Sequence, residues 1–184
     1  LNYALASAIP AMREAAADLS ELMSTAGMEA SRTGNMKFAL NGALSIGTID
    51  GANVEMRDHV GEENIVIFGM TAGEVAKVRA GGHNPRAVIE SSRELSQALS
   101  SIASGVFSPD DPGRFAGLVD GLYQHDWFMV AADFNAYAKA QRQVDELWSD
   151  NAAWYSKTIR NTARMGWFSS DRTIRQYTAD IWRA

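Results

Sequence analysis

The chain has 184 residues, of which 46% are hydrophobic and 21% charged, with 15 Gly and only 4 Pro. This composition is that of one globular domain, and it excludes a disordered or collagen-like chain. A net charge of −5 argues against a nucleic-acid partner. The lack of Cys excludes disulfides and thiolate metal sites, and no apolar stretch approaches the roughly 18 residues of a membrane span.

The chain opens on Leu1-Asn2-Tyr3, without Met and without the layout of a signal peptide. We therefore expect a piece of a longer protein. Short β-like runs then alternate with helical ones: the candidate strands are Asp18 to Ser24, Leu44 to Thr48 and Asn64 to Gly69, and helices are expected near Asn35 to Gly42 and Asn53 to Val60. This alternation favours βαβ units and a parallel sheet.

The second half is predicted to be almost entirely helical. Thr71 and Glu74 have the spacing of a capping box and open a helix that ends at Gly81-Gly82, and Asn84-Pro85 starts the next one. Two layers of helix on a sheet are expected. The remaining helices are placed at Ser92 to Ala103, Arg114 to Tyr123, Asn135 to Trp148, Asn151 to Met165 and Asp171 to Trp182.

Apolar residues recur at helical spacing in the last two of these helices. Trp154, Thr158 and Ile159 share one face of the first helix. The second helix repeats the pattern with Ile174, Tyr177, Ile181 and Trp182. Both faces are expected to pack inward as core.

The stretch from Glu29 to Phe38 carries the chemistry. A loop of small, hydroxylated and Gly residues runs into a helix that begins around Asn35, and backbone N–H groups at a helix N-terminus form an anion site. Thr33 adds a hydroxyl donor, and Gly34 lets a phosphate approach the backbone closely.

Lys37 lies in the first turn of this helix, flanked by Met36, Phe38 and Leu40. Partial desolvation would favour the neutral amine that Schiff-base formation requires. A phosphate cradle beside a lysine suits pyridoxal phosphate, whereas a lone lysine on an amphipathic helix is usually solvated. Spacing alone leaves both interpretations open.

Residues 29–56, EASRTGNMKFALNGALSIGTIDGANVEM, resemble the pyridoxal-phosphate signature of the α-glucan (glycogen, starch and maltodextrin) phosphorylases, which usually reads EASGTGNMKFxLNGALTIGTxDGANVE. The segments GEENIVIFGMTAGEV, QHDWFMVAADFNAY and IRNTARMGWFSSDRTIRQYTADIW resemble the same family. The resemblance covers the chain from about Asp18 to its end.

This resemblance implies a retaining glycosyltransferase of the GT-B type, with two Rossmann-like domains and the active site between them. Such enzymes use phosphate to release glucose 1-phosphate from the terminal α-1,4-linked glucose of glycogen or maltodextrin. Residues 1–184 would belong to the C-terminal cofactor-binding domain, with an α/β part over 1–70 and a mostly helical extension over 71–184. The implied protein is a cytoplasmic, allosteric homodimer, and this segment, which lacks the N-terminal half, is expected to be inactive alone.

The resemblance also assigns roles by position. Lys37 would anchor the cofactor, and Thr33 and Gly34 would bind its phosphate. Glu29 and Ser31 match positions that hydrogen-bond the hydroxyls of the bound glucose, and a carboxylate suits a sugar hydroxyl because it accepts a charge-assisted hydrogen bond.

The sequence departs from the family pattern in two places. Arg32 replaces a Gly, so its side chain either turns to solvent, blocks glucose or binds the substrate phosphate bidentately. Near the start, Asn2-Tyr3 matches an NYxVS motif that then diverges, and the stretch before Asp18 is longer than usual by about one helical turn. Tyr3 lies either beside the pyridoxal ring or in an ordinary core.

The remaining candidates are weaker. His59, His83 and His125 lack the spacing of a metal site, and His125-Asp126 is expected to have a core or capping role. Residues 47–53 predict a turn into a helix with Asp50 or Asn53 near its N-cap, either as a plain loop or as a second wall of the cleft. The alternative to an active enzyme is a catalytically impaired phosphorylase-like sugar-binding or assembly module.

Overall fold

A computed structural model describes residues 17–28 and 34–183. Its sheet has three parallel strands in the order β1 (Leu19–Leu22), β2 (Leu44–Thr48) and β3 (Val66–Phe68). The crossovers contain α2 (Gly34–Leu40) and α3 (Ala52–Val60), followed by the 3-10 turn η1 (Glu62–Asn64). The predicted βαβ pattern and parallel sheet are confirmed.

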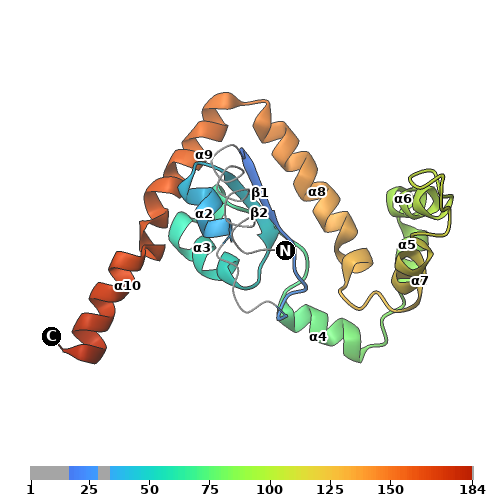
Figure 1. The fold of residues 1–184 in the computed structure, drawn as a ribbon, viewed down its shortest axis with the longest axis horizontal. Helices are drawn as coiled ribbons and strands as arrows, with labels where there is room; N and C mark the ends of the chain where they lie inside the picture. Colours follow the sequence, from blue (N-terminus) through green and yellow to red (C-terminus); the bar gives the residue numbers. More distant parts are fainter. Residues whose placement is uncertain (1–16, 29–33, 184) are drawn as a thin grey trace.

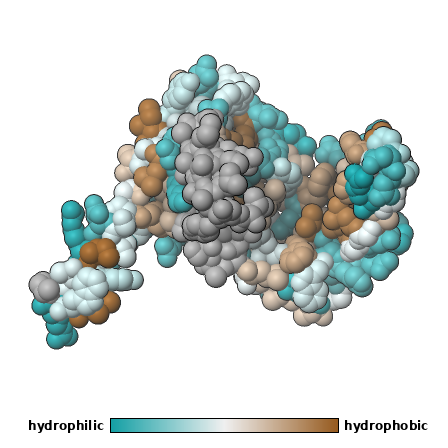
Figure 2. Space-filling model, viewed as in Figure 1, coloured by the Kyte–Doolittle hydropathy of each residue, from teal (hydrophilic) through white to brown (hydrophobic). Residues whose placement is uncertain are grey.

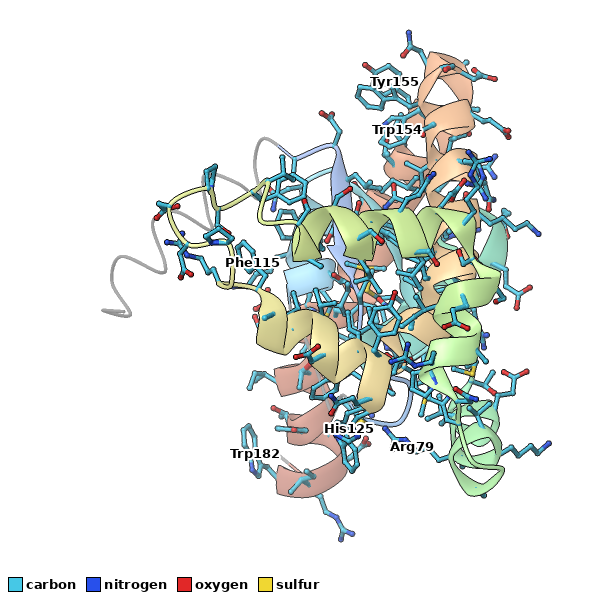
Figure 3. All side chains as sticks on the ribbon, turned by 90° about the vertical axis from the view of Figure 1, so that its right-hand side faces the viewer. Arg79, Phe115, His125, Trp154, Tyr155 and Trp182 are labelled. Carbon is cyan, nitrogen blue, oxygen red and sulfur yellow. The ribbon has the colours of Figure 1, made fainter. Side chains whose placement is uncertain are left out.

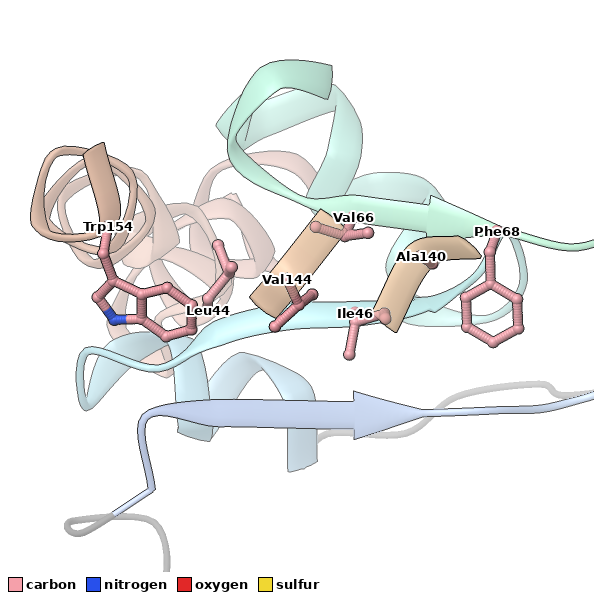
Figure 4. Close-up of a cluster of buried hydrophobic side chains, with 7 residues drawn as sticks. All are labelled: Leu44, Ile46, Val66, Phe68, Ala140, Val144 and Trp154. Carbon is pink, nitrogen blue, oxygen red and sulfur yellow. The ribbon is translucent and has the colours of Figure 1, made fainter. Parts of the chain in front are cut away.

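Helices cover both faces of this sheet (Figure 1). Helix α8 (Val130–Trp148) packs on the face that carries Val66 and Phe68, while Ile67 between them faces the opposite layer. Figure 4 shows the first core, which consists of Leu44, Ile46, Val66, Phe68, Ala140, Val144 and Trp154. The second core, under α2 and α3, consists of Ala39, Met56, Val60, Ile65 and Met165. Strand β2 is buried along its whole length because both of its faces are covered.

The remaining helices follow the predicted order. Thr71 and Glu74 form the predicted capping box, and the Asn84 side chain accepts the Ala87 N–H at the start of the next helix. The other elements are α4 (Ala72–Ala80), α5 (Pro85–Ser91), α6 (Arg93–Ala103), α7 (Ala116–Gln124), α9 (Asn151–Arg164), η2 (Met165–Phe168), α10 (Ser170–Tyr177) and the π-helical turn η3 (Thr178–Trp182).

Helix α8 begins five residues earlier than predicted, at Val130 rather than Asn135. The buried Asp126 carboxylate accepts the N–H groups of Ala131 and Ala132 at 3.0 and 3.1 Å, and His83 Nε2 lies 3.0 Å from the same carboxylate. Asp126 therefore caps α8 from four residues before the helix. Sequence reasoning missed this start because the capping side chain is not adjacent to the first turn.

Two predicted inward faces are wrong in part. On α9, Trp154 and Thr158 are buried, but Ile159 is 66% exposed; Figure 3 shows Trp154 beside the exposed Tyr155. All four apolar residues of the last segment are exposed, Ile181 at 64% among them. The reason is that α10 projects from the body (Figures 1 and 2) and packs mainly on η2 and η3, its neighbours in sequence. Within the described residues, no helix combines the length and apolarity needed to cross a membrane.

Candidate functional site

The carboxyl ends of the three strands meet at one edge of the sheet, where open α/β sheets bind their ligands. Strand β1 leads into residues 23–28, β2 into residues 49–51 and β3 into residues 69–71. Lys37 and Gly34 both lie on α2, the helix that follows the first of these exits. The sheet thus brings the described part of the predicted site to the edge where chemistry is expected.

Lys37 is exposed on α2, so the predicted partial desolvation of its amine is wrong. The helix begins at Gly34, one residue before the predicted start, and a Cβ added at Gly34 would meet no atom within 4 Å. Among the described residues, the backbone at Gly34 is open on this side, and its contact with a phosphate stays a prediction. The other predicted site residues, Tyr3, Glu29, Ser31, Arg32 and Thr33, lie outside the described residues.

A chain of buried amides fixes α2 at this edge. Ser20 Oγ donates to Asn35 Oδ1 at 3.2 Å, and Asn35 Nδ2 donates to Asn53 Oδ1 at 2.5 Å. Asn53 Nδ2 in turn donates to the Thr48 carbonyl at 2.9 Å. Four elements, β1, α2, α3 and β2, are therefore joined through these side chains, and Asn35 stands two residues before Lys37.

The Asn53 side chain explains why residue 47 is glycine. A Cβ at Gly47 would lie 2.4 Å from Asn53 Nδ2 and 2.4 Å from the Leu22 carbonyl oxygen. Asp50 directly precedes the N-cap of α3, Gly51, and Asn53 is the second residue of the helix, so both lie near the N-cap as predicted, although no side chain caps the helix. Asn53 uses its amide between elements instead.

A second polar cluster joins the exits of β1 and β2. Ser24 Oγ donates to Asp50 Oδ2 at 3.1 Å and lies 3.2 Å from Thr48 Oγ1, which also accepts the Ser24 N–H. When Ser24 donates to Asp50, Thr48 donates to Ser24. Asp50 is buried beside this edge and accepts the Ser24 hydrogen bond. The turn after β2 therefore helps to hold the exits of β1 and β2 together.

A cavity of about 490 Å³ opens at the same edge, on the face covered by α8. Its lining comes from the segment that follows β1, the ends of β2 and β3, the loop before α8, and α8 itself. The lining residues are Met23, Ser24, Thr25, Met28, Thr48, Phe68, Phe128, Met129, Val130, Asp133, Phe134 and Tyr137. Lys37 and Gly34 do not line it, because α2 packs on the other face of the sheet.

Two titratable groups of this cavity are perturbed. Burial raises the pKa of Asp133, and the Asp126 and Glu74 carboxylates raise it further, although the Met70 N–H that donates to Asp133 Oδ1 at 2.9 Å partly offsets them. Burial, together with the Glu21 carboxylate, raises the pKa of Tyr137. Sequence reasoning missed both residues, because only the tertiary structure brings α8 over the strand ends.

The three histidines have different surroundings, and His125 is exposed. No group of three or more His, Cys, Asp or Glu side chains in this part of the chain has the geometry of a metal site. His59 stacks on Trp167 with ring centroids 4.2 Å apart, and Asp126 of the His125-Asp126 pair has the predicted capping role.

Comparison with known proteins gives a consistent picture. The carbohydrate phosphorylase family matches residues 2–184. The chain is 54% identical over 167 residues to the brain form of glycogen phosphorylase from Mus musculus, 52% over 167 residues to glycogen phosphorylase from Synechocystis and 48% over 168 residues to that from Haemophilus influenzae. Each alignment covers 91% of this chain but 20% of the relative, so the chain spans about a fifth of their length.

Proposed function

The chain belongs to the carbohydrate phosphorylase family, and from this premise we propose that it is part of a longer α-glucan phosphorylase that depends on pyridoxal phosphate. The reaction is phosphorolysis of the terminal α-1,4-glucosidic bond of glycogen or maltodextrin, with release of glucose 1-phosphate. The observation that carries the proposal is an exposed lysine, Lys37, in the motif that resembles the family's cofactor signature, at the carboxyl edge of a parallel sheet.

The described residues fit the cofactor. The Lys37 side chain is accessible, and open space in front of Gly34 leaves room for a phosphate at the start of α2. Lys37 would hold the cofactor through its aldehyde, and Gly34, together with Thr33, would bind its 5′-phosphate. When bound, pyridoxal phosphate supplies a phosphate that exchanges protons with the substrate phosphate.

The other roles belong to the loop before α2. Glu29 and Ser31 would orient the glucose by accepting and donating hydrogen bonds at its hydroxyls, and Tyr3 would pack beside the pyridoxal ring. The buried amides of Asn35 and Asn53 hold the helix that carries Lys37 against α3.

The proposal extends to the whole protein. These residues would form part of the C-terminal domain of a GT-B enzyme, with the division near residue 70 that the sequence suggested. The complete enzyme would be a cytoplasmic homodimer under allosteric control that acts on an α-1,4-glucan and inorganic phosphate. Because the chain spans about a fifth of its relatives, it should be inactive until the remaining sequence, including the N-terminal half, is supplied.

Borohydride reduction tests the cofactor assignment. The chain and the longer protein are incubated with pyridoxal phosphate and reduced, and the modified peptide is identified by mass spectrometry. A pyridoxyl group on Lys37, absent in Lys37→Gln and unchanged in Lys77→Gln on α4, is the expected result. If the longer wild-type protein carries no such group, the proposal is wrong.

Arg32 favours a second candidate, a sugar-binding or assembly module without turnover, since Arg stands where the family pattern has Gly. Glucose 1-phosphate release by the longer protein separates the two. If wild type is inactive and Arg32→Gly restores release, Arg32 blocks the sugar; if both release it, the module is excluded.

A further inference from the structure

The cavity on the α8 face differs chemically from a sugar site. Among the described residues, four aromatic rings, Phe68, Phe128, Phe134 and Tyr137, line it together with three methionines and one carboxylate, that of Asp133. Sites for small apolar molecules have this make-up, with volumes of roughly 300 to 1,000 Å³ and a few convergent polar groups. The volume of about 490 Å³ falls within this range.

Asp133 gives the cavity its polarity. Its Oδ1 accepts the Met70 N–H at 2.9 Å, and within the described residues no hydrogen-bond donor contacts Oδ2. A side chain on Gly69 would overlap this oxygen, since a Cβ there would lie 2.8 Å from Oδ2. The glycine therefore makes room for a half-buried carboxylate that keeps one oxygen for another partner.

The neighbouring hydroxyls are already engaged. Thr25 Oγ1 donates to the Phe128 carbonyl at 2.7 Å, Ser24 Oγ donates to Asp50, and the Ser24 and Thr48 hydroxyls bond to each other. Among the described lining residues, Asp133 is thus the carboxylate that attracts a positive charge, and the aromatic faces add to this attraction for an organic cation.

We propose that this cavity binds a small organic cation with an apolar body, such as an aromatic amine, with its ammonium group on Asp133 Oδ2. The site is distinct from the proposed cofactor site, because α2 and α8 lie on opposite faces of the sheet. It does not rest on the proposed function.

Occupancy of the cavity would act on the loop after β1. Ser24, Thr25 and Met28 line the cavity. Thr25 also ties this loop to the residues before α8 through the Phe128 carbonyl. A bound cation would therefore contact both sides of this tie.

Tryptamine and tryptophol are matched probes, since they differ in an ammonium against a hydroxyl group. Both are titrated into the longer protein and into the 184-residue chain, with binding followed by ligand-observed NMR and calorimetry. Tryptamine should bind both proteins more tightly than tryptophol does. Asp133→Asn, which keeps the acceptor for Met70, should weaken tryptamine binding about tenfold or more and leave tryptophol nearly unchanged.

Two variants make the result specific. Asp120→Asn, an exposed carboxylate on α7, should have no effect, and Met28→Trp at the rim should block both probes while Asp133 stays intact. Equal tryptamine binding by wild type and Asp133→Asn overturns the proposal. Binding by the chain alone but not by the longer protein also overturns it, since other residues would then fill the cavity. The borohydride experiment on Lys37 is independent of either outcome.

Discussion

At the scale of single residues, the carboxyl edge of the sheet is shaped by glycines that leave room for polar side chains. Gly47 accommodates the Asn53 amide and the Leu22 carbonyl, and Gly69, with φ of 82°, accommodates Asp133. A Cβ at either position would overlap a group that holds this edge together. Glycine is therefore needed at these two positions because groups from other elements occupy the space that a Cβ would fill.

Gly69→Ala should destabilise the protein by about 1–3 kcal/mol, because alanine resists a positive φ and its Cβ would displace Asp133. Gly73→Ala is the matched control: a Cβ at this position of α4 meets nothing within 4 Å, and the change should stabilise the helix by about 0.5–1 kcal/mol. Urea denaturation measures both. Equal effects of the two variants would contradict the assigned role of Gly69.

Asp133→Asn should raise stability at neutral pH. Burial raises the folded-state pKa of Asp133, so its contribution to stability is fully present below its unfolded pKa and is lost as pH rises through the folded pKa. The variant should therefore exceed wild type at about pH 7, and the difference should shrink as the pH falls toward about 4.

Denaturation of Asp133→Asn and wild type at a series of pH values measures this difference. The nearby Asp126 and Glu74 carboxylates are present in both proteins, so the difference between the curves isolates Asp133. Asp120→Asn should follow wild type throughout. A difference between Asp133→Asn and wild type that does not change with pH would show that burial of charge is not the cause.

At the scale of elements, the buried amides decide how α2 sits on the sheet. Helix α2 has only seven residues, too few to be stable alone in water. Its position comes from Ala39 in the core and from the hydrogen bonds of Asn35 to Ser20 and Asn53. The helix that carries Lys37 is thus held by tertiary contacts rather than by its own propensity.

Asn53→Ala should destabilise the protein by about 1–3 kcal/mol, because it leaves the buried Asn35 Nδ2 without its acceptor, whereas the Thr48 carbonyl keeps the Asp50 N–H. Asn41→Ala removes an exposed hydrogen bond to the Lys37 carbonyl and should cost less than about 0.5 kcal/mol. Thermal and urea unfolding give both values.

A double variant tests whether the amides act as one unit. Asn35→Ala and Asn53→Ala combined should cost less than the sum of the single changes, because each single variant already breaks their shared bond. Additive effects would show that the two amides act independently.

At the scale of the whole molecule, a packed body and a projecting helix contribute differently to stability. Both faces of the sheet carry buried cores, whereas α10 and η3 contain no buried residue. Their apolar side chains, including Ile174 and Trp182, are exposed to solvent. The body should fold without them.

Removal of residues 170–184 should leave the free energy of unfolding within about 0.5 kcal/mol of wild type, because no buried area is lost. Trp154→Ala, which removes a ring 4% exposed from the first core, should cost about 3–5 kcal/mol. A large loss on truncation would mean that α10 packs on the body in solution.

The sequence by itself determined the order of strands and helices and the cofactor motif. The hydrophobic periodicity, the Thr71/Glu74 capping box and the Asn84-Pro85 helix start are local signals in the sequence. They predicted the bounds of β2 and the start of α4 correctly. The motif around Lys37 is contiguous in the chain, so the family could be inferred without a structure.

Only the tertiary structure decided which residues lie together at the carboxyl edge. Asn35 meets Asn53 across 18 positions, and Met70 meets Asp133 across 63; no periodicity in the sequence encodes such pairs. It also decided that Ile174 and Ile181 stay exposed, because an apolar face is buried only where another element covers it. The hydrophobic periodicity of the sequence indicates which side chains share a face of a helix or strand. Only the packing of the elements determines what that face contacts.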